Sequence, residues 1–189
     1  RVLFRSRIFP TLVIHTHGIV KLLQKIDTKK ANGPDRIPCW ILKMAAEEVA
    51  PFLQSIFTQS LSAKVVPMDW TKANISAIYK KGDKTLASNY RPVSLTSVPC
   101  KIMEHVIFQH IMNHLDQHNL LADIQHGFRS KHSCETQLIT TVEQIARQLD
   151  IGKQVDTIIL DFSKAFDTVP HRRLLHKLDG YGIRGNILT

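Results

Sequence analysis

The stretch VDTIILDFSKAFD, at Val155–Asp167, carries the clearest strand signal in this chain. Its centre, Ile158–Leu160, is apolar on consecutive residues, which is typical of a strand that is covered on both faces. We therefore predict a strand over Val155–Phe162 that delivers the carboxylate of Asp161 at its exposed end. Phosphoryl and nucleotidyl transfer use carboxylates in such a place, because Mg²⁺ prefers oxygen ligands.

A second carboxylate, that of Asp167, follows six residues later and need not point the same way. The alternative interpretation is that Asp161 ends a strand and Asp167 caps the following helix. The spacing alone leaves both interpretations open.

Apolar periodicity predicts helices on both sides of this stretch. We expect them over Ile19–Ile26, from Pro38, from Pro51, over Lys101–Asp116, from a Ser133 cap to Gly152, and over Pro170–Leu178. The residues expected on their apolar faces are Trp40, Ile41, Met44 and Val49; Phe52, Ile56 and Leu61; Ile102, Met103, Val106, Ile107, Ile111 and Leu115; and Leu138, Val142, Ile145 and Leu149.

Two further extended runs, Ala73–Tyr79 and Val93–Leu95, flank a turn at Lys81–Asp83 and predict a β-hairpin. Helices and strands alternate without a regular βαβ rhythm, which favours the α+β class.

The formal net charge of +9 is concentrated in the first half of the chain. Residues 1–100 hold 15 Lys and Arg against 6 Asp and Glu, whereas residues 101–189 hold 10 of each. A polyanion such as nucleic acid is the natural partner of the first half. A generically basic surface is the alternative.

Five cations in and around the predicted hairpin could bind a triphosphate or a nucleic-acid backbone. They are Lys72, Lys80, Lys81, Lys84 and Arg91. The alternative is a solvated hairpin whose lysines deter edge pairing.

Cysteines and histidines give weaker signals. Cys39, Cys100 and Cys134 form no C-x-x-C pair, so we expect reduced thiols in an intracellular protein. His110, His114 and His118 lie at i, i+4 and i+8, where a metal could bind, but a polar helix face is the favoured interpretation.

The first residues, Arg1–Ser6, look like the translation of a sequencing adapter. We expect residues 1–18 to be an N-terminal extension that is partly artefactual. We find neither a secretory signal nor an apolar stretch long enough to span a bilayer, so the expected location is intracellular, cytoplasmic or nuclear, and not secreted.

Five motifs occur in the order and approximate spacing of one family. They are KKANGPD at 29–35, IYKKGD at 78–83, NYRPVSL at 89–95, QHGFR at 125–129 and DFSKAFDTVPH at 161–171. Together they resemble the reverse transcriptases of non-LTR (LINE-type) retrotransposons, closest to the Jockey-like branch, from about Ile19 to Thr189.

This resemblance implies a right-hand polymerase fold of which the chain holds an incomplete part. Residues 19–100 would form a basic, fingers-like region, and residues 101–189 the start of the palm with polymerase motif A. It also implies two Mg²⁺ ions as cofactor, and RNA template, DNA primer and dNTPs as partners, without a membrane.

The resemblance assigns roles to single residues. Asp161 would be a catalytic ligand of both metal ions, the backbone carbonyl of Phe162 a further ligand, and Phe166 the steric gate against the ribose 2′-hydroxyl. The dNTP triphosphate would contact Lys80, Lys81 and Arg91. Nucleic acid would contact Lys72, Lys84, Gln125, Gly127, Phe128 and Arg129.

One departure bears on activity. The family carries an aromatic-x-Asp-Asp motif with the remaining metal ligands, and this sequence contains no Asp-Asp pair. We therefore expect a fragment of an RNA-directed DNA polymerase that is inactive by itself. The alternatives are a non-catalytic RNA-binding remnant or domesticated fragment and, last, a phosphotransferase with Asp161 as nucleophile.

Overall fold

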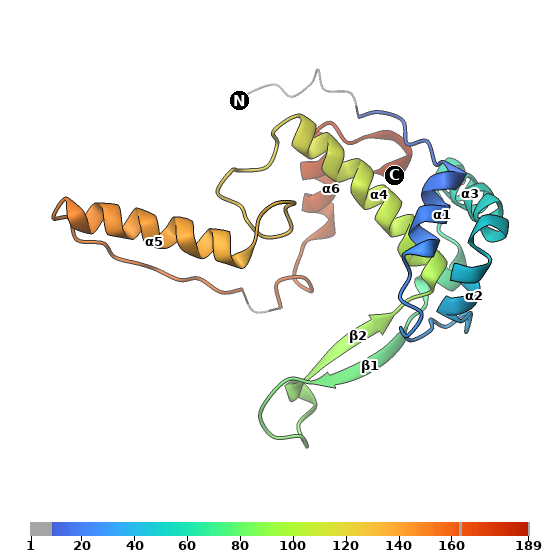
Figure 1. Cartoon of the computed structure of the whole chain (residues 1–189), viewed down its shortest axis with the longest axis horizontal. Coiled ribbons are helices and arrows are strands. Elements are labelled where there is room, and N and C mark those ends of the chain that lie inside the picture. Colours follow the sequence, from blue (N-terminus) through green and yellow to red (C-terminus); the bar gives the residue numbers. More distant parts are fainter. Residues whose placement is uncertain (1–8, 163, 189) are drawn as a thin grey trace. The chain divides into compact units, whose positions relative to one another are not determined.

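A computed structural model describes residues 9–162 and 164–188 (Figure 1). The chain divides into two compact units, one ending at His114 and resuming at Leu178, the other running from Leu115 to Lys177. Helices and one two-stranded sheet make up the regular structure of the described residues, which confirms the predicted α+β class. These two compact units are not the same divisions as the predicted functional regions 1–18, 19–100 and 101–189, which stay a prediction.

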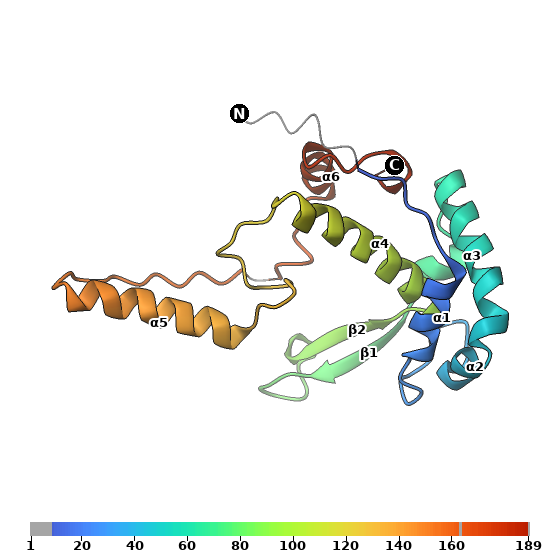
Figure 2. The ribbon, with the colours of Figure 1, turned by 45° about the horizontal axis from the view of Figure 1, so that its top comes forward.

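The core of the first unit lies among four helices. They are α1 (Thr16–Gln24), α2 (Cys39–Met44), α3 (Ala46–Ala63) and the first part of α4 (Val98–Gln117). In Figure 2, α1 lies beside α3. The side chains of Ile19, Leu23 and Phe57 are fully buried, which removes their apolar surface from water.

Helix α3 begins at Ala46, so the prediction of a helix start at Pro51 was wrong. Pro51 lies inside the helix, where it lacks an amide hydrogen, but it is solvent-exposed. The buried stripe begins before the proline, at Ala46 and Ala50, and continues through Leu53 and Phe57. Packing of that stripe outweighs the one hydrogen bond that the proline removes.

The apolar faces predicted for α2 and α3 were mostly wrong. Met44 and Phe52 are 79% and 71% exposed, and Cys39 and Leu42 are buried instead on α2. Helical spacing identifies more than one apolar stripe in these segments, and which stripe is buried depends on the neighbouring helices.

The predicted hairpin is confirmed. Strands β1 (Asn74–Tyr79) and β2 (Tyr90–Leu95) pair antiparallel, from Asn74 opposite Leu95 to Tyr79 opposite Tyr90. β2 leads into α4, whose predicted apolar face is confirmed: Ile102 and Met103 are buried, and Val106 and Ile107 pack against the core.

The second unit contains α5 (Cys134–Asp150) and most of α6 (His171–Gly180). The predicted Ser133 cap is confirmed, because its hydroxyl accepts a hydrogen bond from the amide of Thr136 within a capping box. The predicted core stripe of α5 is not buried, since Leu138 is 64% and Leu149 57% exposed.

The prediction of a buried strand over Val155–Phe162 was wrong. These residues have no regular secondary structure, and Ile158, Ile159 and Leu160 are 80–88% exposed. A strand needs hydrogen-bonded neighbours, and the described residues contain no sheet other than β1–β2. The apolar run therefore has the composition of a central strand without the partner strands.

None of the helices in the described residues combines the length and the apolar character that crossing a membrane requires.

Candidate nucleotide and nucleic-acid interface

The loop that joins β1 to β2 is held by hydrogen bonds from the side chains at its ends. The Tyr79 hydroxyl donates to the carbonyl of Gly82 at 2.5 Å, and the Tyr90 hydroxyl donates to the carbonyl of Lys84 at 2.9 Å. The Asn89 amide donates to the carbonyl of Asp83 at 2.8 Å. The backbone that carries the loop lysines is therefore tied at three successive residues.

The two tyrosine rings also contact each other across the end of the hairpin. Tyr79 and Tyr90 are register partners with ring centroids 5.7 Å apart in an edge-to-face arrangement. This pair was not among the predicted site residues. Its signal in the sequence is a tyrosine at the end of the first predicted run, Ala73–Tyr79, and a second tyrosine three residues before the run Val93–Leu95.

Asp83 supplies a negative charge within the loop. Its carboxylate accepts hydrogen bonds from the backbone amide and the hydroxyl of Thr85, both at 2.8 Å. These two bonds, the backbone one first, lower the pKa of Asp83 below its ordinary value. The carboxylate therefore remains ionised near neutral pH and closes an Asx-type turn.

Four predicted phosphate contacts project from this hairpin and are solvent-exposed. They are Lys80, Lys81, Lys84 and Arg91. Within the part of the chain that the structure describes, none of the four forms an ion pair, although Lys84 lies 5.5 Å from the centroid of the Tyr79 ring. The four positive charges outnumber the single negative charge of Asp83 in the loop. The hairpin tip therefore has a net positive charge and is accessible to an anion.

Lys72 differs from these four cations. Its ammonium lies 3.3 Å from the carboxylate of Asp69, in an exposed pair at the end of the 3₁₀ helix η2 (Met68–Thr71). Such exposed pairs are weak, so the pair leaves Lys72 able to exchange partners.

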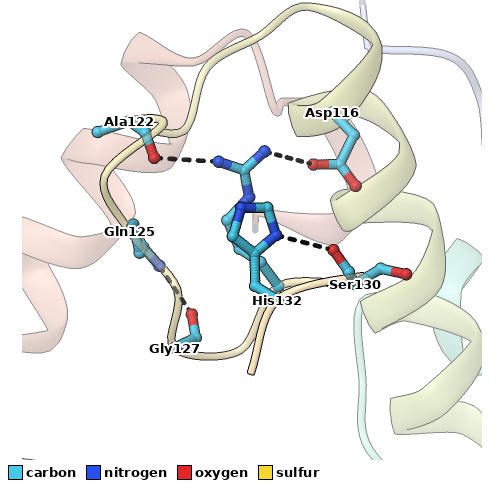
Figure 3. A network of polar contacts seen from close by, with 7 residues as sticks. Asp116, Ala122, Gln125, Gly127, Ser130 and His132 are labelled. Carbon is cyan, nitrogen blue, oxygen red and sulfur yellow. Dashed lines mark hydrogen bonds and ion pairs between the residues drawn. The ribbon is translucent and has the colours of Figure 1, made fainter. Parts of the chain in front are cut away.

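In the second unit, the QHGFR segment forms a loop closed by its own polar groups (Figure 3). The Arg129 guanidinium donates to the carbonyl of Ala122 at 3.0 Å and lies 3.8 Å from the carboxylate of Asp116. Gln125 donates to the carbonyl of Gly127 at 3.2 Å. The Arg129 side chain is only 17% exposed, so it has a structural role in this loop, and its contact with nucleic acid stays a prediction.

The same loop is joined to the start of α5. One ring nitrogen of His126, Nδ1, lies 3.0 Å from the hydroxyl of Thr136, which belongs to the capping box of that helix. The rings of His126 and His132 meet edge to face with centroids 4.8 Å apart. Figure 3 shows His132 beside the carbonyl of Ser130, 3.0 Å from it. These contacts fix both ends of the loop.

The predicted catalytic segment is exposed at residues 161–162 and 164–171, where the structure describes it. Asp161 and Phe162 lie in the extended segment without regular structure, and a turn at residues 164–168 follows. The amides of Asp167 and Thr168 both donate to the carbonyl of Lys164. Since α6 begins at His171, directly after Pro170, Asp167 is not adjacent to that helix, which contradicts the interpretation of Asp167 as its cap.

The described residues do not by themselves form a complete site for the two predicted Mg²⁺ ions. They contain no group of three His, Cys, Asp or Glu side chains that could hold a metal ion. Asp161 is a single exposed carboxylate. Two histidines of the predicted i, i+4, i+8 row have other partners: His110 bonds to the carbonyl of Pro10 and His114 to that of Tyr181, each at 2.9 Å.

One contact joins two of the predicted site residues. The rings of Phe128 and Phe166 lie edge to face, at 90°, with centroids 6.0 Å apart. The loop predicted to contact nucleic acid and the predicted gate therefore meet within the second unit.

Comparison with known proteins identifies the family. The sequence model described as reverse transcriptase (RNA-dependent DNA polymerase) matches residues 78–188, which is more than half of the chain. The chain belongs to the reverse transcriptase family.

The relatives among curated proteins agree with this assignment. The chain is 30% identical over 169 residues to the RNA-directed DNA polymerase from mobile element jockey of Drosophila melanogaster, over 89% of this chain and 18% of that protein. It is 28% identical over 170 residues to the probable RNA-directed DNA polymerase from transposon BS of the same species, over 89% and 19%. The predicted resemblance to LINE-type, Jockey-like reverse transcriptases is confirmed.

A more distant relative is the retrovirus-related Pol polyprotein from type-1 retrotransposable element R2 of Popillia japonica, 25% identical over 118 residues, which are 62% of this chain and 16% of that protein. The chain spans about a fifth of the length of the first two relatives, from 18% to 19%. The family match includes both the cationic hairpin loop and the segment with Asp161.

Proposed function

We propose that this chain supplies the fingers, over residues 19–100, and the start of the palm, over residues 101–189, of a retrotransposon reverse transcriptase. The complete protein adds dNTPs to a primer on an RNA template. The observation that carries this proposal is the family match over residues 78–188, which includes the hairpin loop, β2 and the Asp161 segment in one alignment. An intracellular location, cytoplasmic or nuclear, belongs to the proposal, because the reaction uses RNA and dNTPs.

The hairpin is the proposed contact with the incoming triphosphate. Lys80 and Lys81 are exposed cations of a loop whose backbone is tied by Tyr79 and Tyr90. Arg91 is an exposed cation of β2, in register with Ile78. Fixed cations bind phosphate with little loss of loop entropy on binding. Lys84, in the same loop, and Lys72, before β1 at the other end of the hairpin, are the proposed contacts with a nucleic-acid backbone.

The second unit is the proposed contact with template, primer and the sugar of the dNTP. Gln125, Gly127, Phe128 and Arg129 belong to the closed loop of Figure 3. Phe166 is the gate against ribose. Asp161 would contribute one carboxylate, and Phe162 its carbonyl, to a Mg²⁺ site that requires further acidic residues of the complete polymerase.

A binding-only function is the second candidate, and a specific observation favours it. The cationic hairpin is formed in this chain, whereas no metal-binding group is formed by the residues that the structure describes. RNA binding without chemistry is therefore the activity that we expect of residues 1–189 in isolation. We expect no Mg²⁺-dependent dNTP incorporation by this chain, and detectable incorporation would contradict that.

The experiment compares binding with synthesis. Fluorescence anisotropy with a single-stranded RNA oligonucleotide gives the affinity of the chain at several salt concentrations. The double variant Lys80→Ala/Lys81→Ala should weaken binding and reduce the slope of log K against log salt by about 1–2, because roughly one slope unit is lost for each phosphate contact. A matched control is Lys21→Ala/Lys25→Ala, which removes two exposed lysines of the first unit outside the hairpin.

Asp161→Ala separates the two candidate functions. It should leave the RNA affinity of the chain unchanged and, placed in the complete reverse transcriptase, abolish DNA synthesis. Synthesis that survives Asp161→Ala would refute the polymerase role of that carboxylate. An RNA affinity that does not differ between the hairpin variant and its control would refute the role of the hairpin.

A further inference from the structure

Phe128 and Phe166 form an aromatic pair that no role assigned above explains. Their rings lie at 90° with centroids 6.0 Å apart, a geometry in which the positive edge of one ring meets the negative face of the other. We infer that Phe128 is a positioning residue that holds the ring of Phe166 in the orientation that excludes a ribose 2′-hydroxyl. This inference rests on the proposed function, in which Phe166 is the gate.

The gate ring needs support from outside its own segment. Phe166 is 79% exposed and lies in the turn at residues 164–168. The hydrogen bonds from the amides of Asp167 and Thr168 to the carbonyl of Lys164 fix the backbone of that turn. They do not fix the χ1 angle of Phe166, and an exposed side chain changes rotamer within picoseconds to nanoseconds. A steric gate requires a ring that stays in place.

Phe128 is presented to Phe166 by an unusual backbone conformation. Its φ angle is +60°, which is uncommon for a residue with a β-carbon. With φ in this region, the side chain leaves the loop in a different direction from that of an extended residue. The 82% exposed ring of Phe128 thus meets Phe166 instead of packing under its own loop.

The neighbours of Phe128 hold this conformation on both sides. Before it, the carbonyl of Gly127 accepts a hydrogen bond from the side chain of Gln125. After it, the guanidinium of Arg129 donates to the carbonyl of Ala122 and lies against the carboxylate of Asp116. A strained backbone persists where the surrounding contacts determine it, and such strain is often found at functional positions.

The expected consequence is a graded effect on sugar selection. Removing the gate ring by Phe166→Val should raise the use of rNTPs, measured as the ratio of kcat/KM for rNTP to that for dNTP, by tens of fold (on the order of 10–200-fold for one steric contact). Removing the support by Phe128→Ala should raise the same ratio less, by about threefold to tenfold, because only the edge-to-face contact is lost.

The test uses the complete reverse transcriptase that contains this segment. Four proteins are compared: the parent, Phe128→Ala, Phe166→Val and the double variant. Phe128→Tyr keeps the ring and should restore the selectivity of the parent. Ile124→Ala is a matched control, because Ile124 belongs to the same loop and is also 82% exposed. Its selectivity should equal that of the parent.

The outcomes distinguish failure of the inference from failure of the gate. A Phe128→Ala effect that disappears in the Phe166→Val background supports the inference, because Phe128 then acts through Phe166. Unchanged selectivity in Phe128→Ala, or an effect that adds to that of Phe166→Val, overturns the positioning role and leaves the gate intact. Unchanged selectivity in Phe166→Val overturns the proposed gate and, with it, this inference.

Discussion

The backbone of Gly33 lies directly against the backbone of Ser97. A β-carbon added to Gly33 would lie 2.6 Å from both the Cα and the amide nitrogen of Ser97, and 2.7 Å from the carbonyl carbon of Thr96. Both Gly33 and Ser97 are buried. The NGPD turn that precedes α2 is thereby packed against the junction between β2 and α4, where the hairpin leaves the core of the first unit.

Gly33→Ala should destabilise the first unit. The new methyl group would meet backbone rather than a flexible side chain, so the turn or the β2–α4 junction must move. We expect a loss of about 1–3 kcal/mol in the free energy of unfolding, as for other overpacked sites, measured by urea denaturation. Gly18→Ala is the control, because a β-carbon at Gly18, inside α1, would have no atom within 4 Å. It should stabilise by about 0.5–1 kcal/mol, and equal effects of the two variants would contradict the packing argument.

Arg129→Ala should loosen the loop shown in Figure 3. We expect the free energy of opening of this loop to fall by about 1–2 kcal/mol, because a charged donor to the Ala122 carbonyl is removed. Asp116→Ala should cost less, about 0.5 kcal/mol, since that ion pair is 3.8 Å long and Asp116 is 46% exposed. Hydrogen exchange of the amides between Ala122 and Ser133 would measure the change.

A control for Arg129 is Arg147→Ala, which breaks the exposed pair with Glu143 on α5. Its effect should not exceed about 0.5 kcal/mol. If Arg129→Ala and Arg147→Ala accelerated hydrogen exchange in the loop to the same extent, the structural role that we assign to Arg129 would be refuted.

The pKa of Asp83 should be below the ordinary aspartate value, which an NMR titration of its carboxyl carbon would measure. A lowered pKa means that the turn contributes stability above the unfolded-state pKa, and that this contribution is lost as the pH falls through the lowered value. Thr85→Val removes the hydroxyl and keeps the backbone amide. It should raise the pKa only in part, because the backbone bond is the larger cause. A complete return to the ordinary value would show that the hydroxyl alone is responsible.

The three thiols should react at very different rates with a thiol reagent at pH 8. Cys134 is exposed, whereas Cys39 and Cys100 are buried. Burial, and then the nearby Glu104 carboxylate, raise the pKa of Cys100 to about 11, so little thiolate forms at pH 8. One fast reaction is expected, and Cys134→Ser should remove it. A fast phase that persists in Cys134→Ser would refute this order.

A variant tests the cause of the raised pKa at Cys100. Glu104→Gln removes the negative charge next to the thiol but leaves its burial. The pKa of Cys100 should fall while staying above the ordinary thiol value, because burial is the larger cause. The pH dependence of its alkylation rate in Cys134→Ser/Glu104→Gln would measure this change.

Local chemistry made several elements predictable. The α4 face is set by apolar residues at helical spacing, and the Ser133 cap needs a hydroxyl only three residues from the amide that it accepts. The hairpin follows from two short extended runs around a turn. The family itself was predictable, because five short motifs kept their order along the chain.

Other features depend on residues that are distant in the sequence. The Arg129–Asp116 contact and the Phe128–Phe166 pair have no periodic signal, because each joins segments whose approach is set by loops. Helices α2 and α3 each have more than one apolar stripe, and which stripe is buried depends on the helices that pack against them.

The segment with Asp161 shows most clearly the difference between what the sequence predicts and what tertiary packing decides. The sequence alone determined that VDTIILDFSKAFD has the composition of a buried strand ending in a carboxylate, and that it lies within the match to the reverse transcriptase family. Tertiary structure decided that this run is exposed here, because a strand is stabilised by hydrogen bonds to neighbouring strands and by apolar cover, and the described residues provide neither.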